Sequence, residues 1–409
     1  MHLLIIGNGA AGLSALCRFR DIDRNSKVTL ISAEAGAAYS RVLLPYYLRR
    51  KIPYENLFIR RPEDYERLGV RPEFGMGLSR VDSESRKLTL EDGRSIDYDR
   101  LLIATGSRPF LPAIEGLAGP DVVHLWTLHD TEQLDGLFQP GRRALVLGSG
   151  FIALQAAWAA QQRGLNVTVY ELLPRIMPTV LDERSAALLQ RRVEEHRVKV
   201  HTAIRTERVD RSKTGVLTMH AQNHPPLEVD LIIVGAGVRP NIEFLAGSQV
   251  MVDRGIPIDE YMQTNVPGIY AAGDVARGPT TFGETHQTHA LWPTAVEHGR
   301  IAGQNLAGRR IPYQGSLNMN VTEMFGITVA SMGKFIEEEG LSSYLQQAGA
   351  SRYLKIVLRE GIPVGAVALG GAEDAVILGR LRPWIRNRRR LPDVEGFLKG
   401  RYLLPREVA

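Results

Sequence analysis

The sequence opens with Leu3-Leu4-Ile5-Ile6-Gly7-Asn8-Gly9-Ala10-Ala11-Gly12, an apolar run that leads directly into three glycines spaced as GxGxxG. The run predicts a buried strand over Leu3–Ile6, followed by a helix to about Arg20 and a second strand over Val28–Ser32. Glycines at this spacing allow a tight turn, a close approach of the backbone to a pyrophosphate, and close packing of helix on strand. The stretch therefore predicts a Rossmann-type dinucleotide-binding unit.

The residues that would hold a dinucleotide here are the glycines and an acidic residue beyond the second strand. The start of the helix offers unpaired N–H groups to the phosphates. A carboxylate near the strand end accepts hydrogen bonds from ribose hydroxyls. Glu34 is the candidate, although Ser32 occupies the usual position and Glu34 lies two residues beyond it.

A second glycine turn, Gly148-Ser149-Gly150-Phe151-Ile152-Ala153, fits GxGxxA. We expect a strand over Ala144–Leu147 before it, a helix through about Arg163 after it, and a further strand over Val167–Glu171. A dehydrogenase that acts on a small molecule needs one dinucleotide, whereas a flavoprotein that exchanges electrons with a pyridine nucleotide needs two. Two such units in one chain therefore favour a flavoprotein.

The end of the second unit bears on the choice of coenzyme. A carboxylate at the position of Glu171 accepts hydrogen bonds from the adenosine ribose hydroxyls and repels a 2′-phosphate. Arg175, four residues further on, is a residue that could instead hold a 2′-phosphate. We expect NAD(H) to be preferred over NADP(H).

The composition sets limits on the function. The chain has 409 residues, of which 44% are hydrophobic and 23% charged, as in a globular protein of two or three domains. No apolar run approaches the roughly 20 residues that span a bilayer, and Leu3–Ile6 is too short for a signal peptide, so we expect no membrane span and a cytoplasmic location. The net charge of +5 does not indicate nucleic-acid binding. The single cysteine, Cys17, excludes an intrachain disulfide.

The rest of the chain contains shorter elements. Buried strands are expected over Lys87–Leu90, Leu101–Ala104, Leu231–Val234 and Ile269–Ala272. From about Ile311 the pattern changes, and Tyr353–Leu358 and Val364–Leu369, joined by Glu360-Gly361, predict an antiparallel hairpin. The sequence therefore predicts an α/β fold with two Rossmann-like domains and a C-terminal α+β domain.

Three further motifs accompany the glycine turns, namely Ala104-Thr105-Gly106, Gly237-Val238-Arg239-Pro240-Asn241 and Gly273-Asp274. A carboxylate after a glycine at the carboxyl end of a buried strand faces the ligand crevice of such a fold. It can also cap the segment that follows. With these motifs in this order, the chain resembles the FAD-dependent pyridine nucleotide-disulfide oxidoreductase superfamily over about residues 1–308.

The resemblance implies a division of the chain and a set of contacts. FAD would be bound by residues 1–113 and 247–310, NAD(H) by residues 114–246, and residues 311–409 would form a C-terminal interface domain. The implied FAD contacts are Gly7, Gly9, Ala11, Gly12, Glu34, Arg41, Ala104, Thr105, Gly106, Gly273, Asp274 and Trp292. The implied NAD contacts are Gly148, Gly150, Ile152, Gln155, Glu171, Arg175, Gly235 and Gly237.

The segment Tyr39–Leu48 resembles NADH:rubredoxin reductases and the FAD domain of NADH-dependent nitrite reductases, which lack a redox cysteine. It is also similar to coenzyme A disulfide reductases, but these carry a cysteine where this chain has Val42. Cys17 lies on the first helix and is expected to be a small packing residue. Thiol-disulfide chemistry is therefore not expected.

A second departure from the family concerns the edge of the flavin. Many members pair a glutamate of the NAD helix with a lysine near flavin N5, and the matching residues here are Gln155 and Tyr46. The change is either drift on a helix face or a neutral pair that leaves hydride transfer to stacking and orientation. No metal site is expected, because nothing completes a ligand set with His286 and His289, which we expect to line the flavin pocket.

The leading hypothesis is an enzyme that transfers electrons between NAD(H) and an iron–sulfur partner, by hydride transfer at flavin N5 and single-electron exchange with the partner. The partner would be a rubredoxin- or ferredoxin-like carrier, or the cluster-bearing subunit of a larger complex such as a phenylglyoxylate or carbon monoxide dehydrogenase. Either direction of electron flow is compatible with the motifs. The alternatives are a stand-alone NADH oxidase and a redox-sensing flavoprotein without turnover.

Near the C-terminus there is a cluster of basic residues around Trp384, namely Arg380, Arg382, Arg386, Arg388, Arg389 and Arg390. Such a cluster is commonly a solvated face. It also has the charge to dock an acidic electron carrier, or it could belong to an interface with another copy of the chain.

Overall fold

A computed structural model of the chain describes residues 1–283, 286–336, 338–348 and 352–400. These residues form two compact units, each assembled from separate stretches of the chain. Unit 1 contains Met1–Tyr47, Ile52–Arg108 and Val238–Leu317. Unit 2 contains Leu48–Lys51, Pro109–Gly237 and the described residues from Asn318 onward. The three predicted domain ranges stay a prediction, because one compact unit can contain more than one domain.

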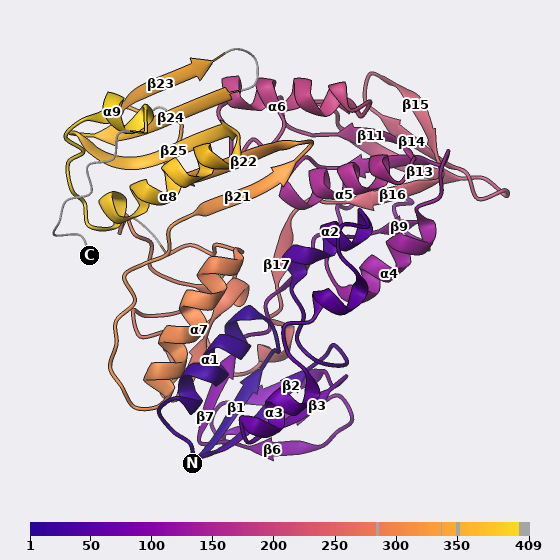
Figure 1. Ribbon diagram of the computed structural model, residues 1–409. Coiled ribbons are helices and arrows are strands. Elements are labelled where there is room, and N and C mark those ends of the chain that lie inside the picture. Colours follow the sequence, from indigo (N-terminus) through magenta and orange to yellow (C-terminus); the bar gives the residue numbers. More distant parts are fainter. Residues whose placement is uncertain (284–285, 337, 349–351, 401–409) are drawn as a thin grey trace. The chain divides into compact units, whose positions relative to one another are not determined.

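The centre of unit 1 is a five-stranded parallel sheet with the strand order β19-β7-β1-β2-β3. Strands β7, β1, β2 and β3 are labelled in Figure 1. Its strands are β1 (His2–Ile6), β2 (Lys27–Ser32), β3 (Val70–Phe74), β7 (Arg100–Ile103) and β19 (Ile269–Ala271). Four of them lie within one residue of their predicted bounds. They are apolar runs because both faces of a parallel sheet are covered.

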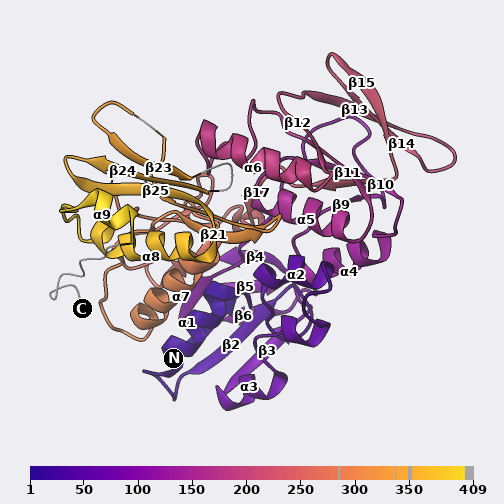
Figure 2. The same cartoon turned by 45° about the horizontal axis from the view of Figure 1, so that its top comes forward.

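The register of this sheet places the predicted ligand edge. Ile6 of β1 pairs with Ile31 of β2 and with Ile103 of β7, so the carboxyl ends of the three strands meet at one edge. Ligands of open parallel sheets bind at this edge. Helices α1 (Ala10–Arg20) and α7 (Trp292–Leu306) pack side by side in the unit (Figures 1 and 2).

The other elements of unit 1 are short. The helices are α2 (Leu44–Leu48) and α3 (Pro62–Arg67), with the 3-10 helices η1 (Arg41–Leu43), η2 (Tyr54–Leu57), η3 (Glu243–Leu245) and η4 (Gly273–Val275). Strands β4 (Leu78–Asp82), β5 (Lys87–Leu90) and β6 (Ser95–Asp97) form an antiparallel sheet. Two-stranded pairs are formed by β8 (Ser107–Pro109) with β17 (Val238–Pro240), and by β18 (Ile256–Pro257) with β20 (Ala276–Arg277).

Unit 2 contains a second five-stranded parallel sheet, with the order β12-β11-β10-β16-β9. Its strands are β9 (Val122–Val123), β10 (Arg143–Leu147), β11 (Asn166–Tyr170), β12 (Lys199–His201) and β16 (Leu231–Val234). Its helices are α4 (Leu128–Leu137), α5 (Phe151–Gln162) and α6 (Glu183–Glu195). Leu147 pairs with Tyr170 and with Val234, so the second glycine turn also leaves its sheet at the carboxyl edge.

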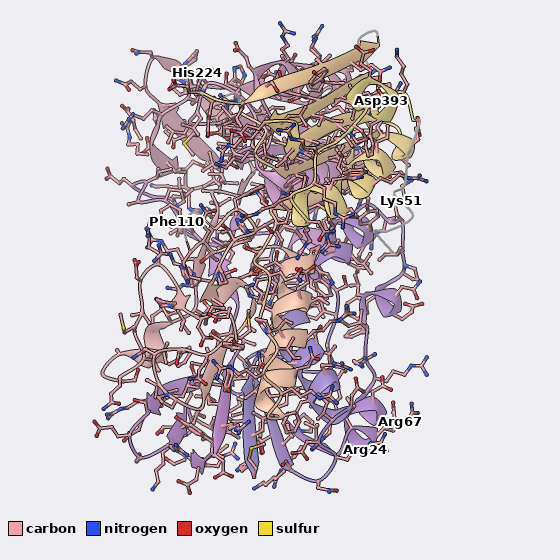
Figure 3. The ribbon with its side chains drawn as sticks, turned by 90° about the vertical axis from the view of Figure 1, so that its left-hand side faces the viewer. Arg24, Lys51, Arg67, Phe110, His224 and Asp393 are labelled. Atoms are coloured by element: carbon pink, nitrogen blue, oxygen red, sulfur yellow. The ribbon has the colours of Figure 1, made fainter. Side chains whose placement is uncertain are left out.

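A three-stranded antiparallel sheet that we did not predict extends from this part of unit 2. It consists of β13 (Thr206–Arg211), β14 (Leu217–Ala221) and β15 (His224–Val229), and His224 at the start of β15 is labelled in Figure 3.

The C-terminal part of unit 2 is a five-stranded antiparallel sheet covered by helices, with the strand order β21-β22-β25-β24-β23. Its elements are β21 (Met319–Met324), β22 (Ile327–Gly333), β23 (Ser342–Ala348), β24 (Arg352–Arg359), β25 (Ile362–Gly370), α8 (Ala372–Arg386) and α9 (Val394–Leu398). The predicted hairpin is confirmed as β24 and β25, with Glu360 at φ 51° and Gly361 at φ 79° in the turn. Asp393, labelled in Figure 3, caps α9 by accepting a hydrogen bond from the N–H of Gly396 at 2.7 Å.

The predicted fold class is confirmed: the chain is α/β, with two Rossmann-like sheets and a C-terminal sheet domain. In the ranges that the structure describes, we find no helix with the length and apolar character needed to cross a bilayer.

Candidate functional site

The first glycine turn has the backbone that a phosphate-binding turn needs. Gly7 has φ 110°, and its N–H donates to the Ile31 carbonyl at 2.7 Å. A Cβ on Gly7 would lie 2.1 Å from the Ala104 carbonyl oxygen, whereas a Cβ on Gly9 would meet no atom within 4 Å. The turn is thus tight on its inner side and open at Gly9, where α1 begins. This open side fits a pyrophosphate.

The predicted acidic residue of this turn is already paired. Glu34 is partly exposed and accepts a hydrogen bond from the Tyr39 hydroxyl at 2.5 Å. Its other oxygen forms an ion pair with Arg41, so the structure brings two of the predicted FAD contacts together. Exposed pairs of this kind contribute little to stability and can rearrange around a ligand.

Asp274 lies at the same edge, in η4, which begins two residues after the end of β19, and its side chain is half-buried. The Ser107 hydroxyl donates to its Oδ2 at 2.8 Å. Burial raises the pKa of Asp274, against the opposing effects of Ser107 and Arg41. A buried carboxylate is costly unless donors surround it, so the site fits a ligand that brings hydroxyl groups, such as the ribityl chain of FAD.

The glycine before Asp274 is held by a buried histidine. The N–H of Gly273 donates to Nδ1 of His298, at 3.4 Å, and His298 lies on α7. Burial and the nearby charge of His289 lower the pKa of His298 to about 4. The neutral ring can accept this hydrogen bond, whereas a ring protonated at Nδ1 cannot.

Asn241, the last residue of the Gly237-Val238-Arg239-Pro240-Asn241 motif, meets the Ala104-Thr105-Gly106 motif within unit 1. Asn241 accepts at its carbonyl from the Thr105 hydroxyl, and its amide donates to the Thr105 carbonyl, both at 2.9 Å. Its N–H donates to the Gly106 carbonyl at 3.0 Å. These bonds fix the segment that follows β7.

The remaining predicted flavin residues of unit 1 are spread over several elements. Ala11 and Gly12 are buried on α1, Trp292 is the first residue of α7, and Tyr46 is half-buried on α2. His289 hydrogen-bonds with the Ser316 hydroxyl at 2.7 Å. His286 is exposed, and its carbonyl accepts from Arg277 at 2.9 Å.

Unit 2 repeats the turn. Gly148 has φ 98°, its N–H donates to the Tyr170 carbonyl at 2.8 Å, and a Cβ there would lie 2.5 Å from the Gly235 carbonyl oxygen. A Cβ on Gly150 would meet no atom within 4 Å. The structure therefore brings together Gly148, Gly150 and Gly235 around an open side like that of the first turn. Gly237, at φ 98°, lies two residues beyond Gly235.

Glu171 follows β11 directly and is buried. Its Oε2 accepts from the Ser149 hydroxyl at 2.5 Å, and its Oε1 accepts from the Leu173 N–H at 2.8 Å. The predicted competitor, Arg175, donates to the carbonyls of Pro178 and Leu181 at 3.1 and 3.4 Å. Its guanidinium is therefore hydrogen-bonded to the backbone of its own loop.

Two other predicted NAD contacts lie on α5. Ile152 is exposed. The Gln155 amide donates to the Thr322 hydroxyl at 2.8 Å and to the Glu323 carbonyl at 2.7 Å, which ties α5 to β21 within unit 2. That Gln155 and Tyr46 lie near flavin N5 stays a prediction.

The side chains that support Asp274 and Glu171 were not predicted from the sequence. Ser107 is 167 residues from Asp274, and only the tertiary fold brings them together. Ser149 lies inside the predicted turn, and its position between two glycines was the available signal.

Unit 1 also has a cavity of about 870 Å³ whose lining includes Arg60, Arg61 and Phe58 but none of the predicted FAD contacts. In the described ranges, the structure shows no group of three or more His, Cys, Asp or Glu side chains placed to hold a metal ion.

Comparison with known proteins gives two family matches along the chain. A family described as pyridine nucleotide-disulphide oxidoreductase matches residues 1–299. The rubredoxin NAD+ reductase C-terminal domain matches residues 319–381.

Individual relatives cover most of the chain. The NADH-dependent phenylglyoxylate dehydrogenase subunit epsilon of Aromatoleum evansii is 30% identical over 371 residues, which cover 89% of this chain and 87% of that protein. An NADH oxidase of Methanocaldococcus jannaschii is 30% identical over 345 residues, covering 81% and 76%. The chain spans about half the length of some other curated relatives. Among solved structures, a ferredoxin reductase from Rhodopseudomonas palustris has a TM-score of 0.89 at 25% identity, covering 98% of this chain and 100% of that one.

Proposed function

The chain belongs to the pyridine nucleotide-disulphide oxidoreductase family, and on that premise we propose that it transfers electrons between NAD(H) and an iron–sulfur protein. The family binds FAD and pyridine nucleotide, so the chain is an oxidoreductase of this kind. The observation that carries the proposal is the second match, to the C-terminal domain of rubredoxin NAD+ reductase. A domain from a reductase of iron–sulfur carriers favours a protein as the second electron partner.

Residues of unit 1 would hold the FAD. The open turn at Gly9 and the helix start behind it would receive the pyrophosphate, and Asp274 would accept hydrogen bonds from the ribityl chain. When bound, FAD converts two-electron hydride transfer at N5 into single-electron exchange with a partner. Because Val42 stands where coenzyme A disulfide reductases carry a cysteine, the chain places no thiol at that position to relay electrons.

Residues of unit 2 would hold the nucleotide and select NADH. Its pyrophosphate would lie on the Gly148–Gly150 turn, and Glu171 would accept hydrogen bonds from the adenosine ribose. Arg175 supports the same choice, because its guanidinium already donates to carbonyls of its own loop. We therefore propose that NADH reduces the flavin faster than NADPH.

For the docking of the partner we propose the basic cluster of the C-terminal domain. Arg388, Arg389 and Arg390 follow α8 and are exposed, and Arg380 is exposed on the helix. Trp384 is buried, so it packs inside the domain and does not contribute to the surface. An acidic carrier would be steered to these arginines by charge.

Stopped-flow kinetics test the function. The flavin would first be reduced with one equivalent of NADH without oxygen, and then mixed with a rubredoxin, a ferredoxin or dissolved oxygen. We expect at least one carrier to reoxidise the flavin far faster than oxygen does. Reoxidation by oxygen alone would favour the NADH oxidase alternative, which the relative from Methanocaldococcus jannaschii supports. Failure of both acceptors would favour a sensor without turnover.

The same apparatus tests the docking surface. Exposed charges are screened beyond about 8 Å at physiological salt, so partner reduction should slow as salt rises while flavin reduction by NADH does not. Replacing Arg386, Arg388 and Arg389 with Gln should reproduce the salt effect. Partner reduction that is indifferent to both changes would exclude this surface.

A further inference from the structure

The loop after β11 is tied to the second glycine turn by one buried side chain, Ser149. Ser149 is 1% exposed, and its hydroxyl has two partners. It donates to Oε2 of Glu171 at 2.5 Å and accepts from the N–H of Met177 at 3.1 Å. A serine hydroxyl has one proton to donate, so its donor capacity is used by the carboxylate.

These bonds fix the direction of the Glu171 carboxylate. One of its oxygens is held by Ser149 and the other by the N–H of Leu173 at 2.8 Å. The backbone of Glu171 is fixed as well, because its N–H donates to the His201 carbonyl at 2.9 Å. The carboxylate of a buried residue held at both oxygens has little freedom to rotate.

The same bonds leave the carboxylate able to accept more. An ionised carboxylate has about four lone-pair sites. In the part of the chain that the structure describes, protein donors occupy two of these sites on Glu171, one on each oxygen. Each oxygen therefore keeps one site, which matches the two hydroxyls of an adenosine ribose.

We propose that Ser149 is a positioning residue that sets the preference for NADH by holding Glu171 in place. The proposal rests on the proposed nucleotide site of unit 2 and adds to it the residue that determines specificity. The glycines on either side of Ser149 shape the turn for the pyrophosphate, whereas its own side chain points to the loop that recognises the ribose. One short turn would thus contact the pyrophosphate through its backbone and position the ribose-binding carboxylate through its side chain.

The test uses nucleotides that do not react. Binding of ADP-ribose and of 2′-phospho-ADP-ribose to the FAD-loaded full chain would be measured by calorimetry for the wild type, Ser149→Ala, Glu171→Ala and the double variant. We expect Ser149→Ala to weaken ADP-ribose about tenfold, as for the loss of a hydrogen bond to a charged group, and to leave 2′-phospho-ADP-ribose nearly unchanged. In the Glu171→Ala background the same substitution should change ADP-ribose binding less than about twofold.

A matched control separates positioning from folding. Ser185 is a second buried serine of unit 2 whose hydroxyl donates to a carboxylate, Oδ1 of Asp182, at 2.6 Å. Ser185→Ala should lower the unfolding temperature as Ser149→Ala does, but it should leave the affinity for ADP-ribose unchanged.

Two results would overturn this inference alone, and a third would overturn the proposed function as well. Equal weakening of both nucleotides by Ser149→Ala, with the same factor in the Glu171→Ala background, would mean that the hydroxyl acts on the pyrophosphate. Unchanged binding of ADP-ribose to Ser149→Ala would mean that Glu171 needs no support. A wild-type chain that binds neither nucleotide would overturn the proposed function together with this inference.

Discussion

The turn at Gly7 in unit 1 and the turn at Gly148 in unit 2 share a backbone conformation but differ in how their side chains are used. The first glycines have φ 110° and 98°, and each N–H donates to the neighbouring strand. The residue between the glycines differs. Ser149 holds the acidic residue of its unit, whereas the amide oxygen of Asn8 accepts from the Tyr65 hydroxyl at 2.9 Å.

The consequence is a different state of the two acidic residues. Glu171 is buried and held by uncharged donors, so each of its oxygens keeps an acceptor site for the ribose that we propose there. Glu34 is partly exposed and paired with Arg41. In unit 1 the carboxylate whose pKa is raised by burial is Asp274. The shared backbone of the two turns fits a pyrophosphate, whereas the selectivity proposed for unit 2 depends on two side chains, Ser149 within the turn and Glu171 beyond it.

The largest expected effect concerns the backbone that the two turns share. Gly7→Ala places a Cβ 2.1 Å from the Ala104 carbonyl oxygen at a φ that alanine rarely adopts, and should destabilise unit 1 by about 4 kcal/mol or more. Gly9→Ala should cost within about 1 kcal/mol, because its Cβ meets no atom, yet it should prevent FAD retention. Thermal unfolding and FAD content would distinguish the two variants. Similar losses of stability in both would contradict this account of the turn.

As the pH falls, unit 1 should lose stability at a higher pH than unit 2. His298 in unit 1 has a pKa of about 4, below its ordinary value of 6.5, because of burial and His289. The unfolded chain therefore binds a proton on this residue at a higher pH than the folded chain does. The stability it contributes is present above pH 6.5 and falls between pH 6.5 and 4, by about 2 kcal/mol from pH 7 to pH 5.

Asp182 in unit 2 should behave differently. Burial raises its pKa, but hydrogen bonds from Ser185, Tyr353 and Lys355 outweigh burial and lower it below 3.8. Its contribution is therefore lost only below about pH 4. Hydrogen exchange at pH 7 and pH 5, corrected for the intrinsic rates, should show α1 and α7 loosening before α6.

The matched variant for the acid effect is His298→Gln, which keeps an acceptor for Gly273 but does not titrate in this range. Asp274 has the opposite effect on stability as the pH falls. Its pKa is raised, so the penalty for burying its charge disappears when it takes up a proton. The difference between the wild type and His298→Gln removes that contribution. A wild type that loses no more stability than the variant between pH 7 and pH 5 would show that His298 is not responsible.

The sequence predicted the parts of these sites that depend on local pattern. The glycine spacing located both turns, and the apolar runs located β1, β10, β16 and the hairpin within a residue or so. The sheet of β13–β15 was missed because strands such as Thr206–Arg211 are mostly exposed and polar. Trp384 was expected beside the arginines but is buried, because the helical period of α8 turns it toward the interior.

The partners of Gly273 and Asp274 were not predictable in the same way. His298 and Gly273 are 25 residues apart, and Ser107 and Asp274 are 167 apart. No spacing rule connects such residues, because their contact depends on how helices and loops return to the sheet edge. Burial of Asp274 is likewise a property of the folded unit.

A smaller effect on the stability of the FAD-free protein should distinguish Asp274 from Glu171. Asp274→Ala should weaken FAD binding about ten- to a hundredfold, as for the loss of charged hydrogen bonds. It should raise the stability of the FAD-free protein, because the desolvation of the carboxylate outweighs its one hydrogen bond from Ser107. Glu171→Ala should lower stability, because it leaves the buried Ser149 hydroxyl and Leu173 N–H without their acceptor. Fluorescence titration with FAD and unfolding of the apo-protein would measure both. A loss of apo-protein stability in Asp274→Ala would contradict the comparison.

The smallest effect is expected at Cys17, and a matching residue of the other unit explains why. Cys17 lies ten residues after Gly7, and Trp158 lies ten residues after Gly148, so the two occupy corresponding positions on α1 and α5. Both are packing positions next to an arginine. The Arg60 guanidinium donates to Sγ of Cys17 at 3.5 Å, and the Arg49 guanidinium lies 3.8 Å from the ring centroid of Trp158.

If Cys17 is a packing residue, Cys17→Ser should leave NADH-dependent dye reduction within about twofold of the wild type and cost about 1 kcal/mol of stability. Trp158→Ala, at the corresponding position of unit 2, should cost about 3–5 kcal/mol because it removes a large buried side chain. Steady-state dye reduction at matched FAD content, with thermal unfolding alongside, would measure both variants. Alkylation of Cys17 provides a second route, since a thiol that carries electrons would lose its function when blocked. A large loss of dye reduction in Cys17→Ser with unchanged unfolding would place redox chemistry on α1 and end the comparison between the two helices.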